Sequence, residues 1–166
     1  MSVTVFMLTC MAELSISVTR HVNAPADTVW QVLTDLDNAA DTLSGVIRIE
    51  RLAGVGYAVG TKWRETRKMM GKEATEDMWV TEVEAPTRTV VKANSHGMNY
   101  TSGFTLKPDA TGTILEMYFS GESESTSRIS KIFTAVFGRL GARVTRKFMA
   151  KDLEDIAAKA EHLSGE

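Results

Sequence analysis

Near its start the chain of 166 residues reads LSISVTRHVNAPADTVWQVLTDLDN over residues 14–38. Apolar and polar residues alternate through 14–22, which is the period of a half-buried strand. Pro25 follows soon after and suits the first turn of a helix, where its missing N–H costs nothing. The sequence therefore predicts a strand over 14–22, a helix over 25–35 and a second short helix over 37–43.

The middle of the chain is dominated by strand signals that are separated by glycine or proline. The predicted strands are 46–53, 60–70, 72–84, 88–95, 98–107 and 112–124. The joints between them are too short for a parallel crossover, which needs about a dozen residues. Consecutive strands are therefore expected to pair as an antiparallel meander.

From 126 to 163 the pattern becomes helical. The order of elements predicts an α+β fold, in which a curved antiparallel sheet wraps around this long C-terminal helix. The aromatic residues of the helix and its later apolar residues lie about half a turn apart, so one straight helix cannot bury both sets. We therefore expect a kink or break between Gly138 and Met149, where two glycines weaken the helix.

Composition excludes several classes of function. The net charge of -2 gives no overall attraction to nucleic acid. The single cysteine, Cys10, excludes an intrachain disulfide and favours the cytoplasm. The three histidines have no ligand-like spacing, so we expect no metal and no cofactor. No membrane span is predicted, and residues 1–11 are expected to be a disordered extension.

Five segments, by their order and spacing, resemble the START-like or SRPBCC superfamily, whose helix-grip fold includes polyketide cyclase/dehydrase-like and lipid-transport proteins. The segments are NAPADTVWQVLTD (23–35), VGTKW (59–63), VTEVEAP (80–86), the GT of ATGT (110–113) and the closing KDLEDIAAKAE (151–161). The resemblance covers roughly residues 12–163, which we take as a single domain.

This resemblance implies an apolar cavity between the sheet and the long helix, with residues 25–43 as a lid at its mouth. Many relatives carry a tryptophan just after the second short helix, where this chain has Leu43. The entrance is therefore expected to be wider or differently gated. We expect a cavity of about 300–1,000 Å³, as in other small-molecule sites.

Strand parity separates the residues that face this cavity from those that face solvent. On strand 60–70, Glu65 and Arg67 share a face with Trp63 and Met69. Two readings stay open: the two charged residues enter the cavity as a pair, or they form a solvated pair on an edge strand, which is slightly favoured. The predicted ligand-binding residues are Trp30, Leu33, Trp63, Glu65, Arg67, Met69, Met98, Tyr100, Ser102, Phe104, Met117, Phe133, Phe137 and Gly141.

Three functions remain open. The favoured one is binding of a hydrophobic small molecule or lipid, for transport or sequestration, because a carrier needs only the cavity. A cyclase/dehydrase-like enzyme would use Glu65 and Tyr100 as candidate catalytic residues, since burial shifts the pKa of a carboxyl toward neutrality. We favour a Glu65 that is paired with Arg67 and stays ionised. An adaptor would bind a protein through the aromatic stripe of Phe133 and Phe137.

The expected partner is therefore a hydrophobic small molecule or lipid, without nucleic acid and without stable membrane insertion, and a homodimer stays open. Between Arg128 and Lys151 there are seven basic residues and no acidic one. The plain reading of this run is a solvated helix face. The alternative is an anionic surface or an anionic ligand group that approaches the helix.

Overall fold

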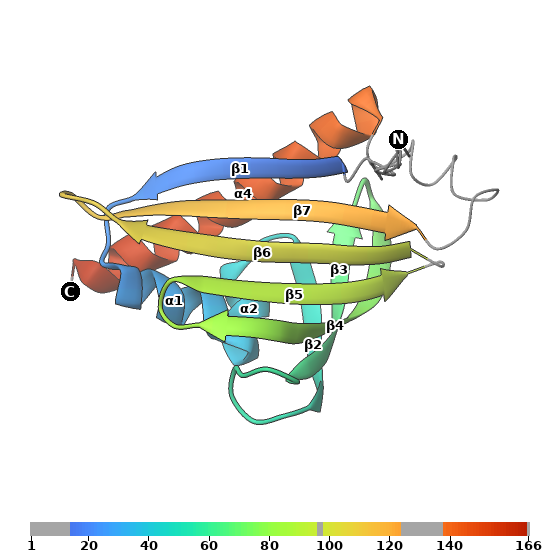
Figure 1. Cartoon of the computed structure of the whole chain (residues 1–166), viewed down its shortest axis with the longest axis horizontal. Helices are drawn as coiled ribbons and strands as arrows, with labels where there is room; N and C mark the ends of the chain where they lie inside the picture. Colours follow the sequence, from blue (N-terminus) through green and yellow to red (C-terminus); the bar gives the residue numbers. More distant parts are fainter. Residues whose placement is uncertain (1–13, 96–97, 124–137, 166) are drawn as a thin grey trace, which may run out of the picture.

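The computed structural model describes residues 14–95, 98–123 and 138–165, which form a seven-stranded antiparallel sheet with helices against one face (Figure 1). The strands are β1 (Leu14–Val22), β2 (Val46–Ala53), β3 (Lys62–Met69), β4 (Lys72–Glu84), β5 (Arg88–Ser95), β6 (Met98–Pro108) and β7 (Thr113–Ser123). The helices are α1 (Ala26–Thr34), the 3-10 turn η1 (Leu36–Asn38), α2 (Ala39–Thr42) and α4 (Arg139–Ser164).

The sheet has the strand order β1-β7-β6-β5-β4-β3-β2, so β1 and β2 form its two edges. Consecutive strands from β2 to β7 are neighbours, and β1 pairs with β7 over its full length, from Leu14 opposite Gly121 to Val22 opposite Thr113. The register shifts between β2 and β3 and between β4 and β5. Such bulges bend a strand and add twist, which accounts for the curvature of the sheet.

The predicted α+β helix-grip fold is confirmed, and so are the bounds of the strands 14–22, 46–53, 72–84 and 88–95. The strand predicted over 60–70 is two residues shorter at its start, because Gly60 has a φ of 89° and belongs to the preceding turn. The predicted extension 1–11 and the aromatic residues Phe133 and Phe137 lie outside the described residues.

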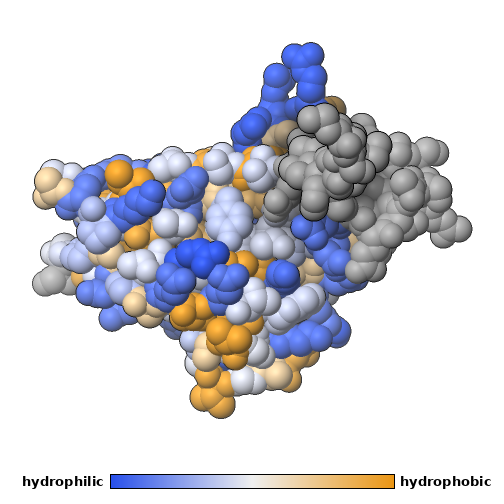
Figure 2. Space-filling view, in the orientation of Figure 1, coloured by the Kyte–Doolittle hydropathy of each residue, from blue (hydrophilic) through white to orange (hydrophobic). Residues whose placement is uncertain are grey.

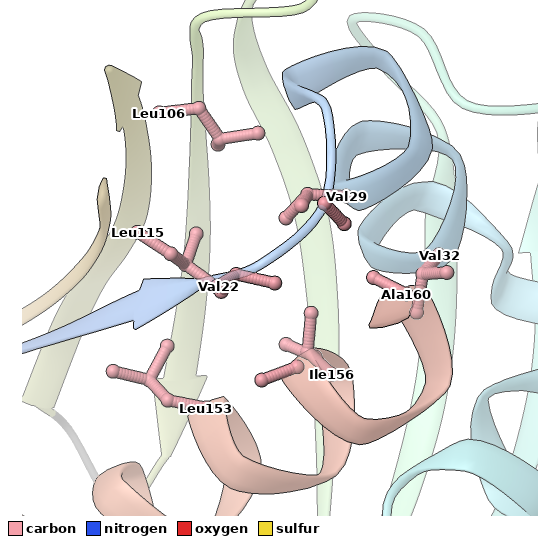
Figure 3. Packing of buried hydrophobic residues seen from close by; sticks show 10 residues of the cluster. Val22, Val29, Val32, Leu106, Leu115, Leu153, Ile156 and Ala160 are labelled. Carbon is pink, nitrogen blue, oxygen red and sulfur yellow. The ribbon is translucent and has the colours of Figure 1, made fainter. Parts of the chain in front are cut away.

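The main hydrophobic core joins the first strand, the first helix and the second half of α4 (Figure 3). Val22 ends β1, Val29 lies on α1, and Leu153 lies on α4, and none of the three side chains has exposed surface. Ala157 and Ala160 are also fully buried, and their small side chains let α4 approach its neighbours closely. This packing fixes the C-terminal half of the helix against one edge of the sheet.

Helix α4 runs without interruption from Arg139 to Ser164, and Gly138 precedes its first turn. The predicted break is therefore wrong between Arg139 and Met149, and a kink there stays a prediction. The buried residues of α4 begin at Met149, whereas Leu140 in its first turn is 74% exposed. Within the described ranges no helix is long and apolar enough to cross a membrane.

The segment 25–44, which contains α1, η1 and α2 and which we call the lid, is tied to the sheet and to α4 by polar contacts. On the sheet side, Arg51 of β2 donates from Nη2 to Asp37 Oδ1 at 2.9 Å. On the helix side, the backbone N and the hydroxyl of Ser44 both donate to Asp155 Oδ2, at 2.8 and 2.7 Å. These bonds hold the lid across one end of the space between the sheet and α4.

We predict that Leu153→Ala lowers the free energy of unfolding by about 2–5 kcal/mol, because it removes a fully buried side chain and leaves a cavity in the core. The matched control is Leu163→Ala on the same helix, where the side chain is 42% exposed and the loss should stay within about 0.5 kcal/mol. Urea unfolding curves of the two variants make the comparison. Equal losses would contradict the assignment of the core.

Candidate ligand-binding site

Two adjoining pockets lie between the sheet, the lid and α4. Pocket 1 lies under the lid and has a volume of about 120 Å³. The lid contributes Leu33, Leu36 and Leu43 to its wall, and the sheet contributes Trp63 and Phe104. The expectation that residues 25–43 border a cavity thus agrees with the position of these side chains.

Pocket 2 continues from pocket 1 toward the turn between β3 and β4 and has a volume of about 220 Å³. Its wall is formed by Met69 of β3, Tyr100 of β6 and Phe119 of β7 on the sheet side, and by Thr145 and Phe148 on the helix side. Each pocket alone is smaller than the predicted range of about 300–1,000 Å³. The predicted cavity is divided in two.

The wall between the pockets is shared. The residues that line both pockets are Glu65, Arg67, Met78, Ser102, Met117 and Asp152. Three of them carry charge and three are methionine or serine. A ligand that extends from one pocket into the other must therefore pass a cluster of charged groups.

The charged cluster is centred on the guanidinium of Arg67. Its Nη2 donates to both carboxylate oxygens of Asp152, each at 2.7 Å. Its Nε lies 3.1 Å from Glu65 Oε1, and Glu65 Oε2 also accepts from Trp63 Nε1 at 3.3 Å. The side chains of Glu65 and Arg67 are 14% and 24% exposed. The reading of a solvated edge-strand pair is therefore wrong, because β2 covers that edge of β3 and α4 faces the pair.

One hydrogen-bond donor of the cluster is not satisfied. Arg67 Nε is buried, and although it lies near Glu65 Oε1 it is the one buried side-chain polar atom in the described residues without a hydrogen bond. Arg67 and Glu65 are thus close enough to form an ion pair, but the Nε–H group is not oriented to form a hydrogen bond with Glu65. A buried donor without an acceptor costs about 1–3 kcal/mol, so an acceptor atom supplied by a ligand would be stabilised here.

Burial controls the protonation of the two acids. Desolvation raises the pKa of Glu65, although the positive charge of Arg67 and the bond from Trp63 act in the opposite direction. Desolvation likewise raises the pKa of Asp152 against the effect of Arg67. Burial opposes the charge of Arg67, but Asp152 and Glu65 outweigh it and raise the pKa of the guanidinium. One permanent cation thus faces two acids that take up a proton more readily than usual.

The second candidate catalytic residue, Tyr100, lies in the wall of pocket 2 together with Glu65. Its ring stacks on Phe119 with the centroids 5.4 Å apart, and its hydroxyl donates to Met98 Sδ at 3.5 Å. Burial raises the pKa of Tyr100. The tyrosine hydroxyl is therefore held by a methionine and not by the carboxylate with which it was grouped.

Most of the other predicted ligand-binding residues line a pocket. Leu33, Trp63 and Phe104 line pocket 1, Met69 lines pocket 2, and Ser102 and Met117 line both. The exceptions within the described residues are Trp30, Met98 and Gly141, which line neither. Trp30 packs edge-on against Tyr57 with the ring centroids 6.4 Å apart, and Met98 is 1% exposed in the core.

Sequence reasoning missed Asp152, Tyr57 and Met78. Asp152 carries the signal that could have found it, because it lies on the same helical stripe as Met149, Leu153 and Ile156 and so had to point inward. Tyr57 belongs to a glycine-rich turn, GVGYAVG, whose conformation the strand pattern does not predict. Among the described residues no group of three or more metal-ligating side chains is close enough to hold a metal ion.

The sequence matches a family model described as polyketide cyclase/dehydrase and lipid transport over residues 13–161. A comparison with curated proteins gives no significant match. Similar solved structures include the protein TTHA0849 of Thermus thermophilus, with a TM-score of 0.73 at 19% identity, covering 91% of this chain and 99% of that one.

Two further similar structures are described as ARO/CYC or aromatase/cyclase proteins. The di-domain ARO/CYC StfQ from the steffimycin biosynthetic pathway has a TM-score of 0.75 at 15% identity, and the match covers 93% of this chain and 53% of that chain. The ZhuI aromatase/cyclase from Streptomyces sp. R1128 has a TM-score of 0.71 at 15% identity, covering 90% and 94%. At such identities the likeness shows the fold.

We predict that Arg67→Met raises the pKa of both Glu65 and Asp152, because it removes the cation that partly offsets their burial. A carboxylate titration by NMR measures the change. In the wild type, both acids already have raised pKa values. Their protonation therefore stabilises the folded protein at low pH, and this contribution is lost as pH rises through the raised pKa values. The variant should therefore lose about 3–5 kcal/mol at neutral pH, and less in mild acid.

The matched control is Arg64→Met, which removes a cation from the same strand but from its exposed face, where Arg64 bonds to Asp77. This change should leave the pKa values of Glu65 and Asp152 in place and alter stability little. Unchanged pKa values of the buried acids in Arg67→Met would show that the cluster does not form.

Proposed function

The chain belongs to the polyketide cyclase/dehydrase and lipid-transport family, which is part of the START-like superfamily. We propose that the protein binds an apolar small molecule that extends through both pockets. The observation that carries this proposal is the pair of apolar pockets divided by one charged cluster. The apolar walls take up the body of the ligand, and the cluster of Glu65, Arg67 and Asp152 contacts a polar group on it.

The walls favour a ligand of irregular or extended shape. Met69, Met78 and Met117 border the pockets, and unbranched methionine side chains adapt to such shapes better than branched ones. Phe104 and Phe119 add flat apolar surface at either side of the cluster. A flat ring system or a flexible chain with few polar groups fits this lining better than a strongly charged metabolite.

The unsatisfied Arg67 Nε supports contact between the cluster and the ligand. The guanidinium lies between two acids, with Nη2 bonded to Asp152 and Nε near Glu65, yet Nε–H has no acceptor. A carbonyl, hydroxyl or enolate oxygen of a bound molecule would satisfy it after a small shift of the guanidinium, because Nε itself is buried, and would also gain from the positive charge. The ligand is therefore proposed to place an oxygen acceptor at the junction between the pockets.

Carrier and enzyme differ in what Glu65 does. In a carrier, Glu65 only balances Arg67 and orients the ligand. The raised pKa of Glu65 specifically favours the second candidate function, a cyclase/dehydrase-like enzyme, because a carboxyl that exchanges protons nearer to neutral pH can act as a general acid or base. The names of the similar solved structures support the same alternative. We keep the carrier first, because Tyr100, the candidate partner in proton transfer, bonds to Met98 and not to Glu65.

A carrier can be distinguished from an enzyme by identifying the molecule that copurifies with the protein and testing whether the protein converts it. Native mass spectrometry identifies it, and the same molecule or a cell extract is then incubated with wild type and with Glu65→Gln. A carrier returns the ligand unchanged in both cases. Conversion by wild type that is lost in Glu65→Gln would assign the enzyme. The adaptor, the homodimer, the cytoplasmic location and a single domain over 12–163 stay predictions.

We predict that Ser102→Phe weakens the binding of a neutral apolar dye, N-phenylnaphthylamine, about tenfold or more, because the added ring fills the junction of the two pockets. The control is Thr101→Phe, which adds the same ring one residue away on the opposite face of β6. Dye fluorescence titrations give both affinities, and thermal unfolding confirms that both variants fold. Equal binding by the two variants would place the dye outside these pockets.

A further inference from the structure

The turn between β3 and β4 carries a large apolar residue in a conformation that disfavours it. Met70 and Gly71 form this two-residue turn, and their φ angles are 49° and 80°. Two positive φ values are typical of a type I′ hairpin, in which asparagine or aspartate before glycine is preferred. A methionine at the first position is strained, and its side chain is 79% exposed. A methionine at this position thus favours neither the geometry of the turn nor the solubility of the protein.

The surroundings of this turn are basic and apolar. Lys68 and Lys72 are exposed on its two sides, and the adjacent Met69 is 39% exposed. Glu73, opposite Lys68 in the register, is the acidic residue nearest in sequence. We call residues 68–72 the hairpin tip. It presents two methionines between two lysines.

The first turns of α4 break a second local rule. Arg139, Arg143, Arg146 and Lys147 are basic residues of these turns, and the first turn holds no acidic residue. The N-terminal end of a helix carries positive partial charge within its first turn, so Arg139 there is unfavourable and no acid offsets it. Leu140, next to the first arginine, is 74% exposed. We call residues 139–147 the basic end of α4.

Pocket 2 connects these two features. Its wall includes Met69 and Ala74 next to the hairpin tip, and Thr145 and Phe148 next to the basic end of α4. The tip and the start of α4 lie toward the same end of the molecule in Figure 1, and the upper end of α4 is covered by hydrophilic side chains in Figure 2. Met69 of the hairpin tip thus lines the pocket, and the exposed cations lie on the two segments that flank it.

We propose that this end of the protein docks on the surface of a lipid bilayer that contains anionic lipid. The cations would lie at the level of the lipid head groups, where each basic residue near the surface is attracted, and the methionines would reach the boundary of the acyl chains. Pocket 2 would then face the bilayer. The inference goes beyond the proposed function, because docking needs no ligand in the pockets.

A bilayer fits better than an acidic protein. An acidic surface would complement the lysines and arginines, but it offers nothing to Met70, the residue whose position is otherwise unfavourable. The other exposed apolar turn, at Val55, makes a useful comparison. Val55 is 96% exposed, but the cation beside it, Arg51, is already paired with Asp37. Exposed apolar surface thus occurs at both turns, and only at the hairpin tip is it flanked by exposed lysines on both sides.

The test is sedimentation of the full chain with vesicles of phosphatidylcholine alone and of phosphatidylcholine mixed with phosphatidylglycerol. Wild type should bind the mixed vesicles only, and added salt should weaken binding. Met70→Asn should weaken binding to the mixed vesicles about tenfold, as expected when a methionine side chain that would be buried in the bilayer is lost. This variant suits the turn, so it should fold at least as well as wild type. Val55→Asn is the matched control and should bind like wild type.

The charge contribution is tested separately. Arg143→Gln combined with Arg146→Gln should weaken binding to the mixed vesicles, whereas Lys92→Gln combined with Lys107→Gln removes two exposed cations from the sheet and should not. Equal binding to both kinds of vesicle, or unchanged binding by Met70→Asn, would overturn the proposal. Retention on an immobilised acidic peptide without vesicle binding would also overturn it and would assign the surface to an acidic protein. The dye titration of Ser102→Phe tests ligand binding in the pockets separately, so a failure of bilayer docking does not bear on the proposed function.

Discussion

The bond between Arg67 and Asp152 joins β3, near one edge of the sheet, to the helix α4. Helix α4 packs mainly on β1 and α1, at one edge of the sheet. Arg67 lies on β3, next to the opposite edge, and its guanidinium reaches Asp152 on α4 with two contacts of 2.7 Å. The space that this pair spans is where the two pockets lie. Helix and sheet are thus joined by apolar packing, mainly at the β1 side, and by charge across the hollow.

The cluster of Glu65, Arg67 and Asp152 is a poor source of stability, which is an argument about its role. Burying three charged groups costs more than their mutual attraction usually returns, and apolar side chains of similar size would often be as stable. Here desolvation raises the pKa of both acids, and one donor of Arg67 has no acceptor among the described residues. A cluster that is costly, incompletely bonded and placed between two apolar pockets fits contact with a ligand better than structural support.

The sequence predicts the fold well, because period-two alternation, turn glycines and the resemblance to a known family all agree. It also predicts that Glu65 and Arg67 share a face, since residues two apart on a strand always do. It misses the pairing with Asp152, which is 85 positions away from Arg67, and parity cannot show where along a strand the hollow lies. Met98 illustrates this second limit: it faces inward as predicted, but at a level where the core is filled.

The account is tested most directly by native mass spectrometry of the protein after incubation with an extract of cellular small molecules. It predicts that one or a few apolar molecules with an oxygen acceptor stay bound in a one-to-one complex and are released on unfolding. It also predicts that Arg67→Met retains them more weakly than Arg64→Met does. A wild-type protein that retains no small molecule, or equal retention by the two variants, would contradict the claim that the divided pocket and its charged cluster form a binding site.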